Sequence, residues 1–160
     1  MTVLSSCTAG SVQPKELIET VLAEHPDLPS ARIIYQSGAI PGQLAYMSPR
    51  LQSLLYDGGR GRELPEFAQV LDYAVCLSDG IYGMEIHVYR MRSRSDTRNM
   101  GKLLSRRAQM MKRRSLYLFA PDAYENYLCS AAVYVEGEFV FLLSTGENES
   151  VLSTLRNRIG

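Results

Sequence analysis

The segment FVFLL, at positions 139–143, is apolar at every position. A strand with one face in water would alternate apolar and polar side chains, so an unbroken apolar run indicates a strand that is covered on both faces. A strand-like segment precedes it at Ser130–Glu136, and Gly137 between the two predicts a tight hairpin. We therefore expect the strand that contains this run to lie inside a sheet, with Phe141 among the least exposed residues.

A second pair of strand-like segments occurs earlier in the chain, at Leu71–Ser78 and Met84–Met91, around Asp79-Gly80 and Gly83. A long helix that begins at Asp96 joins this hairpin to the later one. Because the last strand is expected inside the sheet, the four strands should lie in the order first, second, fourth, third, all antiparallel. The alternative places the second and third strands side by side and parallel. The apolar side of the joining helix consists of Met100, Leu103, Leu104, Ala108 and Met111.

Shorter helices are predicted on either side of these hairpins. Pro14 begins an amphipathic helix that His25-Pro26 ends, and Ser48-Pro49 is typical of a helix cap and first turn. A turn or short helix is expected at Pro121-Asp122, and a closing helix at Glu147–Ile159 with Asn148 as its cap. Residues 32–35 are compatible with a short strand.

These elements predict one α+β domain, in which an antiparallel four-stranded sheet of two hairpins joined by a long helix carries packed helices. A chain of 160 residues with 46% hydrophobic and 21% charged residues is typical of a single folded domain. Residues 1–13 are mostly small and polar, so we expect them to form a flexible N-terminal tether, with the domain at 14–160.

Basic residues are concentrated in one part of the chain. The 17 Lys and Arg balance the 17 Asp and Glu overall, yet positions 90–114 hold ten basic residues and one acid. The simplest interpretation is that these basic residues form a solvated helix face. The next is that they bind an anionic envelope polymer. Nucleic acid is the least favoured partner, because no aromatic residue alternates with the arginines to stack on bases. The candidate anion-binding residues are Arg98, Lys102, Arg106 and Arg113.

The residues of the chain give little support for a catalytic function. His87 shares a strand face with Glu85 and Tyr89, which could supply a general base or a metal ligand. The chain has only two histidines and lacks the known nucleophile, phosphate-loop, metal and dinucleotide motifs. We therefore interpret His87 as a structural or surface residue, and predict no catalytic, cofactor-binding or metal-binding residues and no cofactor.

Two further features have a simple and a functional interpretation. The glycine-rich stretch Gly58–Arg62 could offer backbone donors to a phosphate, but it does not join a clear strand to a helix, which favours a flexible connector. Cys76 and Cys129 could form a disulfide if the fold brought them together, and free thiols are the more common outcome.

The N-terminal residues Leu4-Ser5-Ser6-Cys7 fit the pattern that precedes a lipid-modified cysteine. Such a cysteine follows a basic stretch and an apolar run in the precursor, whereas six residues precede Cys7 in this sequence. Lipidation at Cys7 therefore predicts a signal peptide encoded upstream of Met1 in the same reading frame.

The segments EIHVYRMRSRSDTRNMGKLLSRRAQMMK and APDAYENYLCSAAVYVEGEFVFLLS, with the closing helix, resemble the domain-of-unknown-function family four-three-five-eight. The resemblance begins near Pro14 and is strongest over 84–159. It implies a small envelope lipoprotein of anaerobic Gram-positive bacteria with a short tether after the lipidated cysteine. It implies no catalytic or binding residues.

Our leading hypothesis is a noncatalytic, exported binding or assembly domain, held on the outer face of the cytoplasmic membrane by a lipid on Cys7. Its partner would be an anionic envelope polymer or a protein, and the lipid anchor would be its only contact with the membrane. The alternative is a cytoplasmic regulatory or nucleic-acid-binding domain that uses the four candidate anion-binding residues. A small enzyme ranks third.

Overall fold

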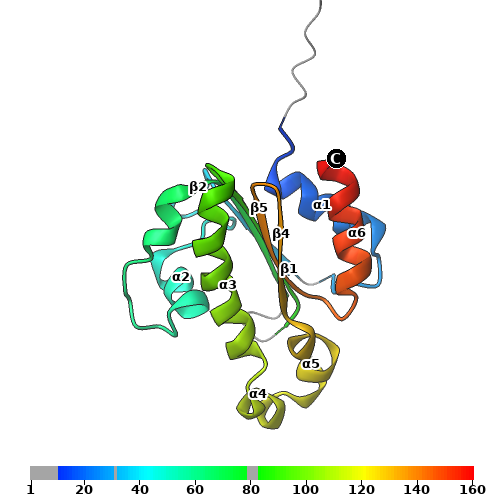
Figure 1. Cartoon of the computed structure of the whole chain (residues 1–160). Helices are drawn as coiled ribbons and strands as arrows, with labels where there is room; N and C mark the ends of the chain where they lie inside the picture. The colour runs from blue at the N-terminus through cyan, green and yellow to red at the C-terminus, as the bar shows by residue number, and fades with distance from the viewer. Residues whose placement is uncertain (1–10, 31, 79–82) are drawn as a thin grey trace, which may run out of the picture.

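The computed structural model describes residues 11–30, 32–78 and 83–160. Its helices and strands are α1 (Pro14–Glu24), β1 (Arg32–Gln36), α2 (Pro49–Tyr56), the 3-10 turn η1 (Pro65–Gln69), β2 (Val70–Ser78), β3 (Glu85–Met91), η3 (Arg94–Asp96), α3 (Thr97–Met111), α4 (Arg114–Phe119), α5 (Pro121–Asn126), η4 (Leu128–Ser130), β4 (Ala132–Glu136), β5 (Phe139–Ser144) and α6 (Asn148–Ile159). Figure 1 shows three layers, with the sheet between α1 and α6 on one side and α2 and α3 on the other. α4 and α5 form a lobe at one end of the molecule.

The sheet has five antiparallel strands in the order β1-β2-β3-β5-β4. The sequence predicts four strands, and this number is wrong because the sheet has a fifth. The additional strand is the edge strand β1, in which Ile33 pairs with Leu77 of β2. The sequence is compatible with a short strand at 32–35, and β1 is found there, but every residue of β1 is partly exposed, so no apolar pattern predicts its place in the sheet. The predicted α+β class is confirmed.

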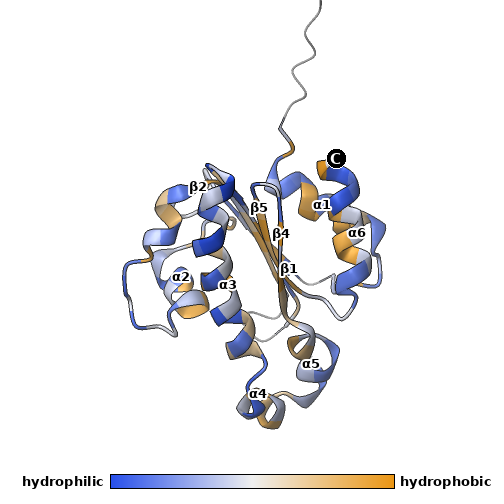
Figure 2. Ribbon diagram, viewed as in Figure 1, coloured by the Kyte–Doolittle hydropathy of each residue, from blue (hydrophilic) through white to orange (hydrophobic). Residues whose placement is uncertain are grey.

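The order of the other four strands is as predicted, because β3 pairs with β2 and β5, and β4 pairs only with β5. The alternative with a parallel central pair is wrong. β5 is buried at every position, and Phe141 is fully buried opposite Val88 of β3. Figure 2 shows the apolar residues gathered on the strands between the two helical layers. The predicted turn residues Asp79-Gly80 lie outside the described residues.

Local hydrogen bonds explain where the helices begin. Glu16 accepts from the amide of Gln13 at 3.3 Å at the start of α1, and Ser48 Oγ accepts from the amide of Leu51 at 3.2 Å at the start of α2. The predicted cap at Asn148 is wrong. Asn148 is the first residue of α6, and its Oδ1 accepts from the amide of Thr145 at 3.0 Å, so its side chain fastens the preceding turn.

The region after β3 differs from the sequence prediction in one element. α3 buries the expected apolar residues and exposes Arg98, Lys102 and Arg106, whereas the predicted Arg113 lies beyond its end and is also exposed. α4 is not predicted, because Arg114–Phe119 is a six-residue helix whose large apolar residues are consecutive and form no helical stripe. This helix places Leu118 and Phe119 at the surface of the terminal lobe.

Candidate functional site

The loop that follows α2 is held against the end of that helix. The amides of Asp57 and Gly59 both donate to the carbonyl of Ser53 at 2.9 Å, and Gly59 has a φ of 78°, which glycine adopts without strain. The Gly61 amide donates to Ser53 Oγ and the Arg62 amide to Asp57 Oδ2, each at 2.7 Å. These amides are therefore not free to cradle a phosphate, and the loop contributes to the surface through its side chains.

An open hollow of about 660 Å³ lies between this loop and the outer side of α3. Arg60 and Arg62 line it from the loop, and Arg106 and Arg113 line it from α3 and the turn that follows. All four arginines are exposed. The glycine-rich stretch and the basic helix, which are distant in sequence, thus meet around one hollow.

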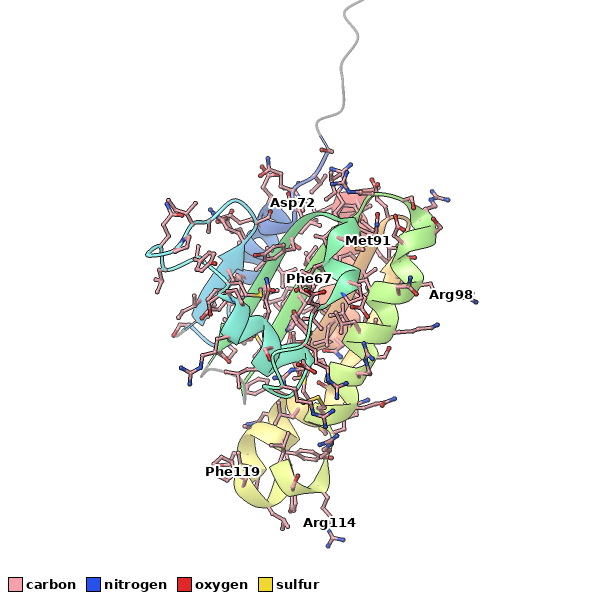
Figure 3. The ribbon with its side chains drawn as sticks, turned by 90° about the vertical axis from the view of Figure 1, so that its left-hand side faces the viewer. Phe67, Asp72, Met91, Arg98, Arg114 and Phe119 are labelled. Carbon is pink, nitrogen blue, oxygen red and sulfur yellow. The ribbon has the colours of Figure 1, made fainter. Side chains whose placement is uncertain are left out.

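A second hollow, of about 700 Å³, continues along α3 toward the edge strand β4. Arg98, Lys102 and Arg106 line it, together with Val133 and Val135 of β4. Figure 3 shows Arg98 projecting from the outer side of α3. All four candidate anion-binding residues are therefore exposed and line one hollow or both. We call the combined surface the arginine surface, and its basic residues are Arg60, Arg62, Arg98, Lys102, Arg106 and Arg113.

The arginine surface carries six basic residues, and its acidic residues are Asp57, Glu63 and Glu66. Arg106 Nη2 lies 3.3 Å from Glu66 Oε1, and Arg62 Nε lies 3.8 Å from Asp57 Oδ1. Within the described part of the chain, the other four cations form no ion pair: Arg60, Arg98, Lys102 and Arg113. The surface is net positive and will attract anions.

Five polar side chains form a second feature beneath this surface, and we call them the buried polar cluster. Glu85, His87 and Tyr89 alternate along β3 on the face toward α2 and α3, as the sequence predicts. Tyr56 joins them from α2 and Arg107 from α3. Each of the five residues is at most 5% exposed.

The hydrogen bonds of the buried polar cluster form a continuous chain. Arg107 donates to Glu85 through Nε, at 3.2 Å from Oε2, and through Nη2 to Oε1. His87 Nε2 lies 2.8 Å from Glu85 Oε2, and His87 Nδ1 lies 2.7 Å from the Tyr56 hydroxyl. The Tyr56 and Tyr89 hydroxyl oxygens lie 2.5 Å apart.

Burial and neighbouring charges shift the pKa values of three residues in the cluster. Burial alone would raise the pKa of Glu85, but the Arg107 guanidinium and the hydrogen bond from His87 outweigh burial and lower that pKa. One set of proton positions satisfies all of these contacts: His87 Nε2–H donates to Glu85, Nδ1 accepts from the Tyr56 hydroxyl, and the Tyr56 oxygen accepts from Tyr89. Burial raises the pKa of both tyrosines, so their hydroxyls stay protonated.

This arrangement gives His87 a structural role. His87 is fully buried, and both of its ring nitrogens bind protein groups, which leaves neither to act on a substrate. Arg107 joins α3 to β3, and Tyr56 joins α2 to β3, so the cluster fixes the two helices beside the arginine surface. The described residues contain no group of three or more His, Cys, Asp or Glu side chains that could hold a metal ion.

The sequence does not single out Arg107 or Tyr56, although a signal for Arg107 exists. Arg107 follows Leu103 by four positions and Leu104 by three, which is the spacing of the buried side of α3. An arginine on that side requires a buried acceptor, and Glu85 is the carboxylate on the facing strand.

The two cysteines that the structure describes lie in different settings. Cys76 and Cys129 are free thiols, the first buried in β2 and the second exposed in η4. Burial raises the pKa of the Cys76 thiol to about 11. Cys7 lies outside the described residues. Where the structure describes the chain, none of its helices has the length and apolar character needed to span a bilayer.

Comparisons of the chain with protein-family models, curated proteins and solved structures found no match. The resemblance to the domain-of-unknown-function family therefore stays a prediction. A functional proposal has to rest on the residues of the chain itself.

Proposed function

We propose that this chain is a noncatalytic binding domain, held at the cell envelope through a lipidated Cys7, whose arginine surface binds a phosphate-bearing polymer. The observation that carries the proposal is the meeting of Arg60 and Arg62 with Arg106 and Arg113 around one hollow. A guanidinium offers a planar fork of N–H donors that suits phosphate oxygens. Among the residues that the structure describes, four cations of the arginine surface have no carboxylate partner and are available for such contacts.

The extent of the arginine surface favours a polymer over a single phosphate. α3 has fifteen residues and is therefore about 22 Å long; Arg98 lies near its first residue and Arg113 just beyond its last. The two hollows share Arg106, so the basic residues between these ends form a continuous surface. A ligand with several regularly spaced phosphates could contact all of them.

The surface does not offer a platform for nucleic-acid bases. Tyr56 is the only aromatic residue lining either hollow in the described part of the chain, and it is 4% exposed. Its hydroxyl is bound to His87 and Tyr89. Single-stranded nucleic acids gain affinity by stacking on exposed aromatic rings. This favours a phosphodiester polymer without bases over the nucleic-acid alternative.

Fluorescence anisotropy with a labelled poly(glycerol phosphate) tests the binding. The double variant R106Q/R113Q should bind at least about fivefold more weakly, and the affinity should fall less steeply with salt, because two phosphate contacts are lost. The matched control is R156Q/R158Q, which also removes two arginines but from α6, on the opposite side of the sheet. In each pair one arginine has an acidic partner, Glu66 for Arg106 and Glu136 for Arg156.

Two outcomes would contradict the proposed binding. Equal weakening in both double variants would show that net charge alone drives the association. Tighter binding to single-stranded DNA of equal charge than to poly(glycerol phosphate) would select the nucleic-acid-binding alternative.

The anchoring part of the proposal has its own test. Two acyl chains on Cys7 would make membrane attachment stable, whereas one would give only marginal attachment. We expect the gene, expressed with its complete upstream reading frame, to give a membrane-bound protein with a diacylglyceryl-modified Cys7 in the mass spectrum of its N-terminal peptide. An unmodified peptide that begins near Met1, recovered from the cytosolic fraction, would reject the lipid anchor.

A further inference from the structure

The lobe of α4 and α5 ends in large apolar side chains that face solvent. Tyr117, Leu118 and Phe119 are 40%, 73% and 75% exposed, and they are the last three residues of α4. Single exposed apolar residues are common on proteins, whereas exposed patches that adjoin polar residues mark contact sites. Figure 3 shows Phe119 projecting away from the lobe. We call these three residues the apolar tip.

Three cations lie at the start of α4, the helix that ends in the apolar tip. Lys112, Arg113 and Arg114 precede the helix and are all exposed, and Figure 3 shows Arg114 at the outer end of the lobe. The carboxylates of the lobe, Asp122 and Glu125, lie on α5. Apolar side chains next to Lys and Arg are the combination that binds the interface of an anionic bilayer.

The geometry of the apolar tip suits a fluid bilayer better than a groove on a protein. Successive residues of a helix point about 100° apart, so three consecutive side chains spread over about 200°. A groove contacts one side of a helix, whereas lipids can surround a protruding helix end.

Two hydrogen bonds hold the backbone where α4 meets α5. The Ala120 amide donates to the Leu116 carbonyl at 2.8 Å, and the Ala120 carbonyl accepts from the Tyr124 amide at 2.9 Å. The ring of Tyr117 packs edge-on against that of Tyr124, with centroids 5.5 Å apart. The junction of α4 and α5 can therefore enter a region of low water content without losing these hydrogen bonds.

We propose that the apolar tip inserts into the interface of an anionic lipid bilayer while Lys112, Arg113 and Arg114 contact lipid phosphates. This contact is additional to the lipid anchor predicted at Cys7 and does not depend on it. Figure 1 shows α4 at the end of the molecule opposite to the start of α1. A molecule that used both contacts on one bilayer would lie along the membrane surface.

The chain contains no tryptophan, so F119W places a unique fluorescent reporter in the apolar tip. The protein without lipid on Cys7 is mixed with vesicles of phosphatidylglycerol and phosphatidylcholine. We expect a blue shift of the emission and quenching by lipids brominated on their acyl chains, and neither effect with phosphatidylcholine alone. The control L44W reports from a loop residue that is 78% exposed, and its emission should not change.

Sedimentation with the same vesicles distinguishes the contribution of the apolar tip to vesicle binding from that of the arginine surface. L118S/F119S should reduce the bound fraction at least about fivefold while the protein stays folded, since both side chains are largely exposed. R98Q/K102Q, which alters only the arginine surface, should retain vesicle binding even though it weakens polymer binding. Loss of vesicle binding in R98Q/K102Q with retention in L118S/F119S would overturn the inference. So would the absence of binding at low salt, which would leave the tip as a contact for a protein.

Discussion

Replacing Arg107 with methionine should destabilise the domain by about 3 to 5 kcal/mol at pH 7, the cost of leaving a buried charge without its partner. The side chains of Arg107 and Glu85 are 5% and 0% exposed, and two hydrogen bonds join them. Methionine retains an unbranched stem for packing but supplies no donor, so among the described residues Glu85 would keep only His87 as a hydrogen-bond partner. With a urea dependence of about 2 kcal/mol per M, the unfolding midpoint should fall by about 1.5 to 2.5 M.

The contribution of Glu85 to the pH dependence of stability should have opposite signs in R107M and in the wild type. In the wild type, the pKa of Glu85 lies below its ordinary value of 4.5, so its contribution to stability is present above that pH and is lost as the pH falls through the lowered pKa. In R107M, burial dominates and raises the pKa of Glu85. The folded variant then takes up a proton that the unfolded chain does not hold, so acid stabilises it. The loss of unfolding free energy in R107M relative to the wild type should therefore be smaller at pH 5.5 than at pH 7.5.

Urea unfolding followed by far-ultraviolet circular dichroism measures both effects. The control R106M removes a neighbouring arginine whose side chain is 60% exposed, and it should change the unfolding free energy by no more than about 1 kcal/mol. The variant E85Q/R107M carries neither charge and should recover a large part of the loss, even if R107M itself folds poorly. The reasoning would be refuted if R107M matched R106M in stability, or if its deficit did not change between the two pH values.

Three other results are expected. Phe141→Ala should cost about 3 to 5 kcal/mol in urea unfolding, as for other buried aromatic residues, and an unchanged midpoint would contradict the interior position of β5. Glu66→Gln should strengthen binding to poly(glycerol phosphate) by roughly two- to fivefold, because it removes the carboxylate paired with Arg106, and weaker binding would argue against that arginine as a ligand. At pH 8, Ellman's reagent should modify Cys129 quickly and Cys76 only after unfolding, because Cys76 is buried and its pKa is raised to about 11; equal rates would contradict its burial.

The fold could be predicted from the sequence to the extent that local patterns determine it. The apolar run at 139–143 indicates that β5 lies inside the sheet. Once β5 is inside, the two hairpins can be arranged in the observed order of β2, β3, β5 and β4. β1 and α4 carry no comparable signal. The residues of β1 are all partly exposed, and α4 is short and presents consecutive apolar residues to solvent.

The candidate site could be predicted only in part, because it depends on contacts between distant segments. The basic residues of α3 are recognisable from their helical spacing. Their neighbours Arg60 and Arg62 belong to a loop whose position depends on hydrogen bonds to Ser53 and Asp57. Arg107 differs from Arg106 by one position in sequence but points into the core, where the buried carboxylate of Glu85 compensates its charge.

The most direct measurement of the proposed binding surface is an NMR titration that follows the arginine Nε–Hε signals while a short poly(glycerol phosphate) is added. We expect the signals of Arg60, Arg106 and Arg113 to shift together and to saturate with one affinity, because these side chains line one hollow. The signals of Arg156 and Arg158 on α6 should remain in place. Shifts of similar size on α6, or no shift at Arg60 and Arg113, would contradict the arginine surface as the binding site.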